Sequence, residues 1–212
     1  ADWENGYKQV FYANVALDAL KRISAGRDRD ELTGSALFIR SLAYFNLVTA
    51  FAEPYVAGTA ASVPGIPIYL AADVNARHGR GNLKQVYDQI VGDLNQSIDL
   101  LPASATVKTR PTKTAALALL ARVYLSMEDY PKAGDFADQA LRQNNKLINS
   151  NTLNTSAARP MPAGLPNGND EVIFYARLTS FSYFSSAATG VVPELYASYH
   201  SNDLRRSVYF ND

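Results

Sequence analysis

The chain has 212 residues with 20 basic and 20 acidic side chains, so its formal net charge is zero, and 47% of its residues are hydrophobic. A neutral chain without a basic block is a poor partner for nucleic-acid phosphates or an anionic membrane surface, and we expect neither partner. The sequence contains no cysteine, which excludes disulfides, thiolate zinc sites and cysteine nucleophiles. Its 13 tyrosines supply aromatic surface beyond what packing alone requires.

Residues 1–145 have the apolar periodicity of α-helices. A first helix is predicted over residues 3–24, with Gly26 as its C-terminal cap, and a second, buried on most sides, over 31–51. Prolines and glycines interrupt residues 53–83, which are predicted to form a long loop insertion that projects from the helices. Three further helices are expected, at residues 86–101, at 111–127, and from Pro131 onward.

Residues 146–212 have a different character and are predicted as a second region, the start of a C-terminal part. A loop rich in Asn, Ser, Thr and Pro comes first. Residues 171–176 have the β-branched and aromatic content of a short strand, and Pro193 is expected to begin a short helix.

The fourth and fifth predicted helices carry a repeat that resembles a tetratricopeptide unit. Five positions of the repeat carry the expected residue types: Leu120, Ala121, Tyr124, Ala133 and Ala140. The small residues among them let two antiparallel helices approach closely, and the Tyr124 ring fills the space beside them. Three other positions depart from the pattern, at Leu117, Ala137 and Asn145. The fold class is therefore predicted as mainly α, built from tetratricopeptide-like antiparallel helical hairpins with long loops and a short strand element.

The sequence offers no constellation of residues for catalysis or metal binding. His78 and His200 have no second ligand at helical spacing, and Gly79-Arg80-Gly81 lacks the strand and Lys-Ser/Thr of a phosphate loop. The acidic residues are scattered, so that no pair stands out for glycoside hydrolysis. We therefore expect no enzymatic activity, no metal and no cofactor.

Aromatic residues in the non-helical segments are the candidate binding residues. An exposed ring can stack on the C–H face of a sugar while neighbouring polar groups bind its hydroxyls. The candidates are two residues of the insertion and three after the predicted strand: Tyr55, Tyr69, Phe181, Tyr183 and Phe184. The alternative interpretation is that these rings only cover the helix ends. Trp3 is assigned to the apolar stripe of the first helix with Tyr7 and Val10.

Several sequence blocks resemble, in order, the SusD/RagB family of nutrient-binding outer-membrane lipoproteins. The first is residues 33–48 (TGSALFIRSLAYFNLV), followed by Glu53-Pro54. The others are 86–90 (VYDQI) with Asp93-Leu94 and Leu101-Pro102, 112–117 (TKTAAL), 121–125 (ARVYL), Asp129-Tyr130, Lys132-Ala133, 169–174 (NDEVIF) and 202–206 (NDLRR).

This resemblance implies a tetratricopeptide-like α-α superhelix that captures a polysaccharide, oligosaccharide or other nutrient at the cell surface. It also implies docking on a SusC-type TonB-dependent outer-membrane transporter and a lipid anchor on an N-terminal cysteine. Membrane contact is then expected only through that anchor, which this chain lacks, and the chain is expected to be a piece of a longer protein. The alternative functions are a tetratricopeptide-type interaction scaffold without its own ligand site and, ranked last, a glycosidase.

Overall fold

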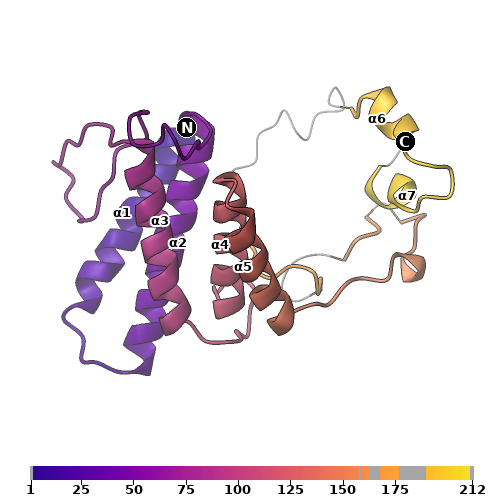
Figure 1. Ribbon diagram of the computed structural model, residues 1–212. Helices are drawn as coiled ribbons and strands as arrows, with labels where there is room; N and C mark the ends of the chain where they lie inside the picture. The colour runs from indigo at the N-terminus through magenta and orange to yellow at the C-terminus, as the bar shows by residue number, and fades with distance from the viewer. Residues whose placement is uncertain (1, 158, 163–167, 177–189, 211–212) are drawn as a thin grey trace. The chain divides into compact units, whose positions relative to one another are not determined.

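The structure is a computed structural model that describes residues 2–157, 159–162, 168–176 and 190–210 (Figure 1). The chain divides into two compact units. Unit 1 comprises Ala1–Thr106 and Arg110–Asn145, and unit 2 comprises Val107–Thr109 and Lys146–Asp212. The described regular structure is helical, which confirms the predicted mainly α fold class. A single antiparallel bridge between Pro64 and Asn82 is the only strand-type pairing among the described residues.

Unit 1 consists of five long helices that pack in chain order (Figure 1). α2 contacts α1, α3 and α4, while α5 packs on α4. The helices are α1 (Asp2–Leu20), α2 (Arg27–Phe51), α3 (Leu83–Leu100), α4 (Lys113–Ser126) and α5 (Tyr130–Gln143).

The boundary between the first two predicted helices is wrong, and α2 begins at Arg27 rather than at residue 31. The first helix ends at Leu20 instead of near residue 24, and Gly26 is the N-cap residue of α2 rather than the C-cap of α1. The physical reason lies in the first turn of α2, which contains Asp28 and Asp30. Acidic side chains in a first turn interact favourably with the helix dipole, so they favour the beginning of a helix directly after Gly26.

Side-chain caps fix where the later helices of unit 1 begin. Asn82 and Gln85 form a capping box at α3, in which the Asn82 side chain accepts from the Gln85 N–H at 2.8 Å. The Thr112 side chain accepts from the Ala115 N–H at α4. At α5 the Asp129 carboxylate accepts from the Lys132 N–H, and a proline lies in the first turn.

The core of unit 1 is centred on α2. By length and composition alone α2 could cross a membrane, but 61% of its apolar window is buried inside the unit, as in the core helix of a folded domain. Tyr44, Phe38 and Leu47 of this helix are among the largest fully buried side chains. α3 and α4 contribute six further members of that set: Leu83, Val86, Ile90, Leu94, Leu117 and Leu120.

The insertion between α2 and α3 folds back onto the helices, so its first part does not project as predicted. Ala60 and Ile66 are fully buried. The Arg80 side chain donates to the carbonyl oxygens of Gly65 (2.5 Å) and Phe51 (2.8 Å), which joins the end of the insertion to its beginning. Residues 70–81 remain mostly exposed.

Unit 2 contains short elements in its described part: a 3-10 turn (Ser150–Thr152), α6 (Pro193–Ser198) and α7 (Arg205–Tyr209). The helix predicted to begin at Pro193 is present as α6. The strand predicted over residues 171–176 is absent, because no second strand pairs with this described segment. Its backbone bonds to a distant residue at Tyr175, whose N–H donates to the Lys108 carbonyl oxygen at 2.8 Å.

Candidate functional site

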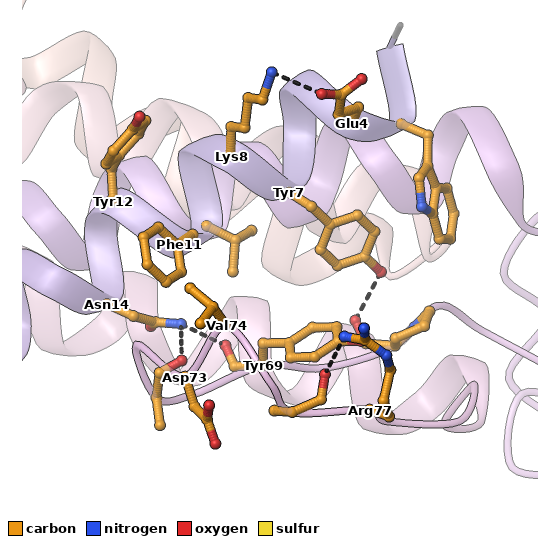
Figure 2. A pocket seen from close by; sticks show the side chains of 15 residues that line it. Glu4, Tyr7, Lys8, Phe11, Tyr12, Asn14, Tyr69, Asp73, Val74 and Arg77 are labelled. Atoms are coloured by element: carbon orange, nitrogen blue, oxygen red, sulfur yellow. Dashed lines mark hydrogen bonds and ion pairs between the residues drawn. The ribbon is translucent and has the colours of Figure 1, made fainter.

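A hollow of about 420 Å³ opens in unit 1 between α1 and residues 67–77 of the insertion. Aromatic rings dominate its lining: Trp3, Tyr7, Phe11 and Tyr12 come from α1, and Tyr69 comes from the insertion. Figure 2 shows Tyr7, Phe11 and Tyr12 of α1 on one side and Tyr69, Val74 and Arg77 on the other. This hollow, which we call the aromatic hollow, is the candidate binding site.

The spacing of residues along α1 explains why they line one hollow. Trp3, Tyr7, Phe11 and Asn14 follow each other at intervals of four, four and three residues, so they lie on one face of the helix. The Trp3 and Tyr7 rings lie 4.8 Å apart between centroids, and Trp3 also meets the Phe51 ring edge-on at 5.1 Å. The rings thus hold each other at fixed angles.

Tyr69 closes the opposite side of the aromatic hollow. Its ring packs edge-on against Tyr7 at 5.6 Å and against His78 at 4.7 Å. The Tyr69 hydroxyl oxygen also accepts from the His78 backbone N–H at 3.4 Å. Tyr69 therefore contacts both α1 and the turn at residues 73–78 that rims the hollow.

Hydrogen bonds between α1 and the insertion fix the floor of the hollow. The Tyr7 hydroxyl donates to the Pro67 carbonyl oxygen at 2.8 Å, and Asn14 Nδ2 donates to the Tyr69 carbonyl oxygen at 2.9 Å (Figure 2). Burial raises the pKa of Tyr7 well above the usual range for a tyrosine. The hydroxyl is therefore a neutral donor at physiological pH.

Charged groups lie at the rim of the aromatic hollow. Glu4 and Lys8 form an exposed ion pair at 2.7 Å, and Lys8 lowers the pKa of Glu4 through its hydrogen bond. Asp73 accepts from the Asn75 N–H at 2.8 Å, and Arg77 donates to the Ala76 carbonyl oxygen. The lining thus combines aromatic rings, which can stack on the C–H face of a sugar, with charged groups, which can bind its hydroxyls.

Two further hollows are more polar than the aromatic one. One lies between residues 68–81 of the insertion and the glutamine-bearing face of α3, where Gln85, Gln89 and Gln96 contribute to its lining. The other belongs to unit 2 and involves residues 155–157 and 196–210. In the part of the chain that the structure describes, no group of three or more His, Asp or Glu side chains could hold a metal ion.

The structure places one of the five candidate residues from the sequence in the aromatic hollow and another in the core. Tyr69 lines the aromatic hollow. Tyr55 is a core residue, only 9% exposed, with its ring 4.8 Å from that of Tyr87, so the structure does not place it where a ligand could stack on it. The remaining three, Phe181, Tyr183 and Phe184, lie outside the described residues.

The aromatic residues of α1 are lining residues that the sequence interpretation missed. The spacing of Trp3 and Tyr7 predicts that both belong to the apolar stripe of the helix, and this pattern does not include Tyr12. In the structure Trp3 is 39% exposed and Tyr12 is 67% exposed. The sequence feature that indicates this site is Tyr12. Its ring lies off the apolar stripe of the helix, so packing against the other helices does not explain an aromatic residue at this position.

Comparison with known proteins places the chain in a family. Residues 1–125 match a family of SusD-like proteins described as starch-binding and associating with the outer membrane. SusD-like protein P2 of Formosa agariphila is 27% identical over 139 residues, which cover 65% of this chain and 26% of that protein.

Solved structures agree with this assignment. A SusD superfamily protein from Bacteroides thetaiotaomicron is 28% identical with a TM-score of 0.64, covering 70% of this chain and 34% of that one. A laminarin-binding SusD-like protein is 25% identical with a TM-score of 0.59, covering 69% and 32%. The chain thus spans about a quarter of the curated relative and about a third of these two structures. With more than half of its length matched by the family, the chain belongs to the SusD-like proteins.

Proposed function

We propose that the chain binds a glycan in the aromatic hollow and takes part in nutrient capture at the outer membrane without catalysing a reaction. The observation that carries this proposal is the set of rings from α1 and Tyr69 around one open hollow, with charged groups at its rim. The membership in a starch-binding family and the laminarin-binding relative support a polysaccharide as the ligand class. No residue set of the hollow suggests acid–base chemistry on that ligand.

The single tryptophan of the chain makes this proposal directly testable. Trp3 lines the hollow, so a glycan that stacks there changes its fluorescence. We would titrate the chain with laminarin and starch oligosaccharides and follow both Trp3 emission and the heat of binding. The proposal requires saturable binding of at least one of them, without release of shorter sugars.

A matched pair of tyrosine variants locates the binding. Tyr12 lies in the hollow and is 67% exposed, whereas Tyr130 begins α5 and is 63% exposed. Losing a stacked ring costs about 1 kcal/mol, so Tyr12→Ala is expected to raise Kd roughly fivefold to tenfold. Tyr130→Ala is expected to leave Kd unchanged. Equal affinities of wild type and Tyr12→Ala would contradict the assignment of the hollow.

We further propose that the full-length protein is a surface lipoprotein that delivers its glycan to a SusC-type TonB-dependent transporter. The outer-membrane association of the family supports this step. Tagged full-length protein should co-purify from outer membranes with a barrel that mass spectrometry identifies as TonB-dependent. Co-purification of the barrel with no glycan affinity in any titration would instead favour the interaction scaffold.

A further inference from the structure

The segment that carries Tyr69 is held onto α1 through its backbone. The carbonyl oxygen of Pro67 accepts from the Tyr7 hydroxyl at 2.8 Å, and those of Tyr69 and Ala71 accept from Asn14 Nδ2 at 2.9 and 3.3 Å. Tyr7 and Asn14 are two helical turns apart, a rise of ~10.5 Å. Four steps of extended backbone, from Pro67 to Ala71, span a similar length, ~13 Å. Tyr7 and Asn14 can therefore donate to the carbonyl oxygens of alternate residues of this segment.

This alternation decides which side chains face which hollow. Pro67, Tyr69 and Ala71 line the aromatic hollow, while Ile68 and Leu70 line the polar hollow beside α3. A shift of the segment by one residue would exchange the two sets, as in a slipped strand. The register of residues 67–71 is therefore what places the Tyr69 ring opposite Tyr7.

Asn14 owes its orientation to a buried ion pair. Arg40 Nη1 donates to Asn14 Oδ1 at 2.8 Å, and Arg40 Nε and Nη2 each donate to one carboxylate oxygen of Asp93 at 2.7 Å. Gln89 Nε2 donates to the same carboxylate at 2.8 Å. Asn14, Arg40 and Asp93 are 1%, 7% and 2% exposed, so water does not compete for these bonds.

The chemistry of these groups leaves Asn14 one orientation. A guanidinium is only a donor, so the amide oxygen of Asn14 must face Arg40 and the NH₂ group must face the carbonyls of Tyr69 and Ala71. Fold stability alone does not explain this ion pair, because a well-packed apolar pair is often as stable as a buried salt bridge. What apolar side chains cannot do is orient the amide.

We propose that Arg40 and Asp93 are positioning residues of the aromatic hollow: through Asn14 they fix the register of residues 67–71 and hence the place of the Tyr69 ring. This inference rests on the proposed function for its effect on glycan binding. Arg40 and Asp93 lie on α2 and α3 and do not themselves contact the aromatic hollow.

The test compares two disconnecting variants with a core control. Asn14→Ala removes the two bonds from Asn14 to the segment. Arg40→Met with Asp93→Leu removes the ion pair while keeping the core filled. Leu94→Ala is the control, because Leu94 is fully buried on the same helix as Asp93 and has no polar atom to orient Asn14.

The first readout is hydrogen exchange of the Tyr69 amide, which donates to the Tyr44 hydroxyl oxygen at 2.6 Å. The second readout is laminarin affinity.

We expect both disconnecting variants to speed Tyr69 amide exchange at least about tenfold and to weaken laminarin binding about fivefold, while Leu94→Ala changes neither more than about twofold. Exchange within about twofold of wild type in Asn14→Ala, or an equal rise in Leu94→Ala, would overturn the inference. If the double variant does not fold, Asn14→Ala decides. If wild type binds neither laminarin nor starch oligosaccharides, the proposed function fails, and the exchange rates still decide whether the ion pair fixes the segment.

Discussion

Tyr44 of α2 is a fully buried side chain whose hydroxyl group satisfies both bonding groups of one residue in the insertion. Its oxygen accepts from the Tyr69 N–H at 2.6 Å, and its proton is donated to the Tyr69 carbonyl oxygen at 2.7 Å. An ionised phenolate could accept the first bond but could not donate the second. Burial accordingly raises the pKa of Tyr44 to about 12, from an ordinary value of 10.0.

This pKa shift predicts that ionisation of Tyr44 lowers the stability of the folded chain at high pH. Below pH 10 the ring is neutral in the folded and unfolded chains, so its contribution is fully present. Between pH 10 and about 12 the unfolded chain loses this proton while the folded chain keeps it, and stability falls as pH rises. Two pKa units correspond to about 3 kcal/mol.

The measurement is the free energy of unfolding in denaturant for wild type and Tyr44→Phe. At pH 8 the variant should be less stable by about 1–3 kcal/mol, because the Tyr69 N–H loses its acceptor and the Tyr69 carbonyl oxygen loses one of its two donors. That gap should shrink between pH 10 and 12, since only wild type titrates at this position. A gap that stays constant up to pH 12 would contradict the prediction.

Tyr55 and Tyr69 show how far single residues of the site can be predicted. Both lie in the same insertion among the same kinds of residue, so the sequence predicts both as candidate binding residues. Tyr69 faces the hollow because Asn14 and Tyr44 bind its backbone, whereas Tyr55 packs on Tyr87 in the core. Such contacts join residues 25 to 55 positions apart, and local patterns do not encode them.

At the scale of elements, the approach of α2 to the end of α3 depends on a glycine. A Cβ atom at Gly34 would lie 2.9 Å from Leu100 Cβ and 3.1 Å from Leu101 Cγ. Gly34→Ala should therefore force the helices apart and cost about 1–3 kcal/mol, although alanine is the better helix former. Denaturant unfolding of the variant measures this cost.

Gly92 provides the matched control within α3. A Cβ atom there has no atom within 4 Å, so Gly92→Ala should keep the packing and stabilise the unit by up to about 1 kcal/mol. Opposite signs for the two substitutions would show that helix approach, rather than helix propensity, decides at Gly34. A stabilising Gly34→Ala would contradict the requirement for a glycine where α2 meets the end of α3.

The helices of unit 1 could be predicted because their signals are local. Asn82, Thr112 and Asp129 cap the helices that follow them, and the apolar spacing within each helix is regular. The strand expected at residues 171–176 failed because a strand also needs a partner, which its own composition does not supply. The tetratricopeptide assignment stays a prediction, although the stacked Tyr124 and Phe136 rings, 5.4 Å apart, join α4 to α5.

At the scale of the whole molecule, the described aromatic hollow is confined to one unit. Its lining residues run from Trp3 to Arg77, and all belong to unit 1, as do Arg40 and Asp93. The three loop aromatics Phe181, Tyr183 and Phe184 lie outside the described residues, in the sequence range of unit 2. The two candidate sets for glycan binding can therefore be separated by cutting the chain after Asn145, which leaves only Val107–Thr109 of unit 2 on the fragment.

A chain that ends at Asn145 is predicted to fold and to keep its glycan affinity within about twofold of the 212-residue chain. The reason is that α1 to α5 and the insertion between α2 and α3 bury the core residues of unit 1 among themselves and contain both walls of the aromatic hollow. Circular dichroism and a single cooperative unfolding transition would report the fold, and Trp3 fluorescence would report binding. A folded fragment that has lost its affinity would instead assign the binding to unit 2, where Tyr183→Ala in the longer chain should then reproduce the loss.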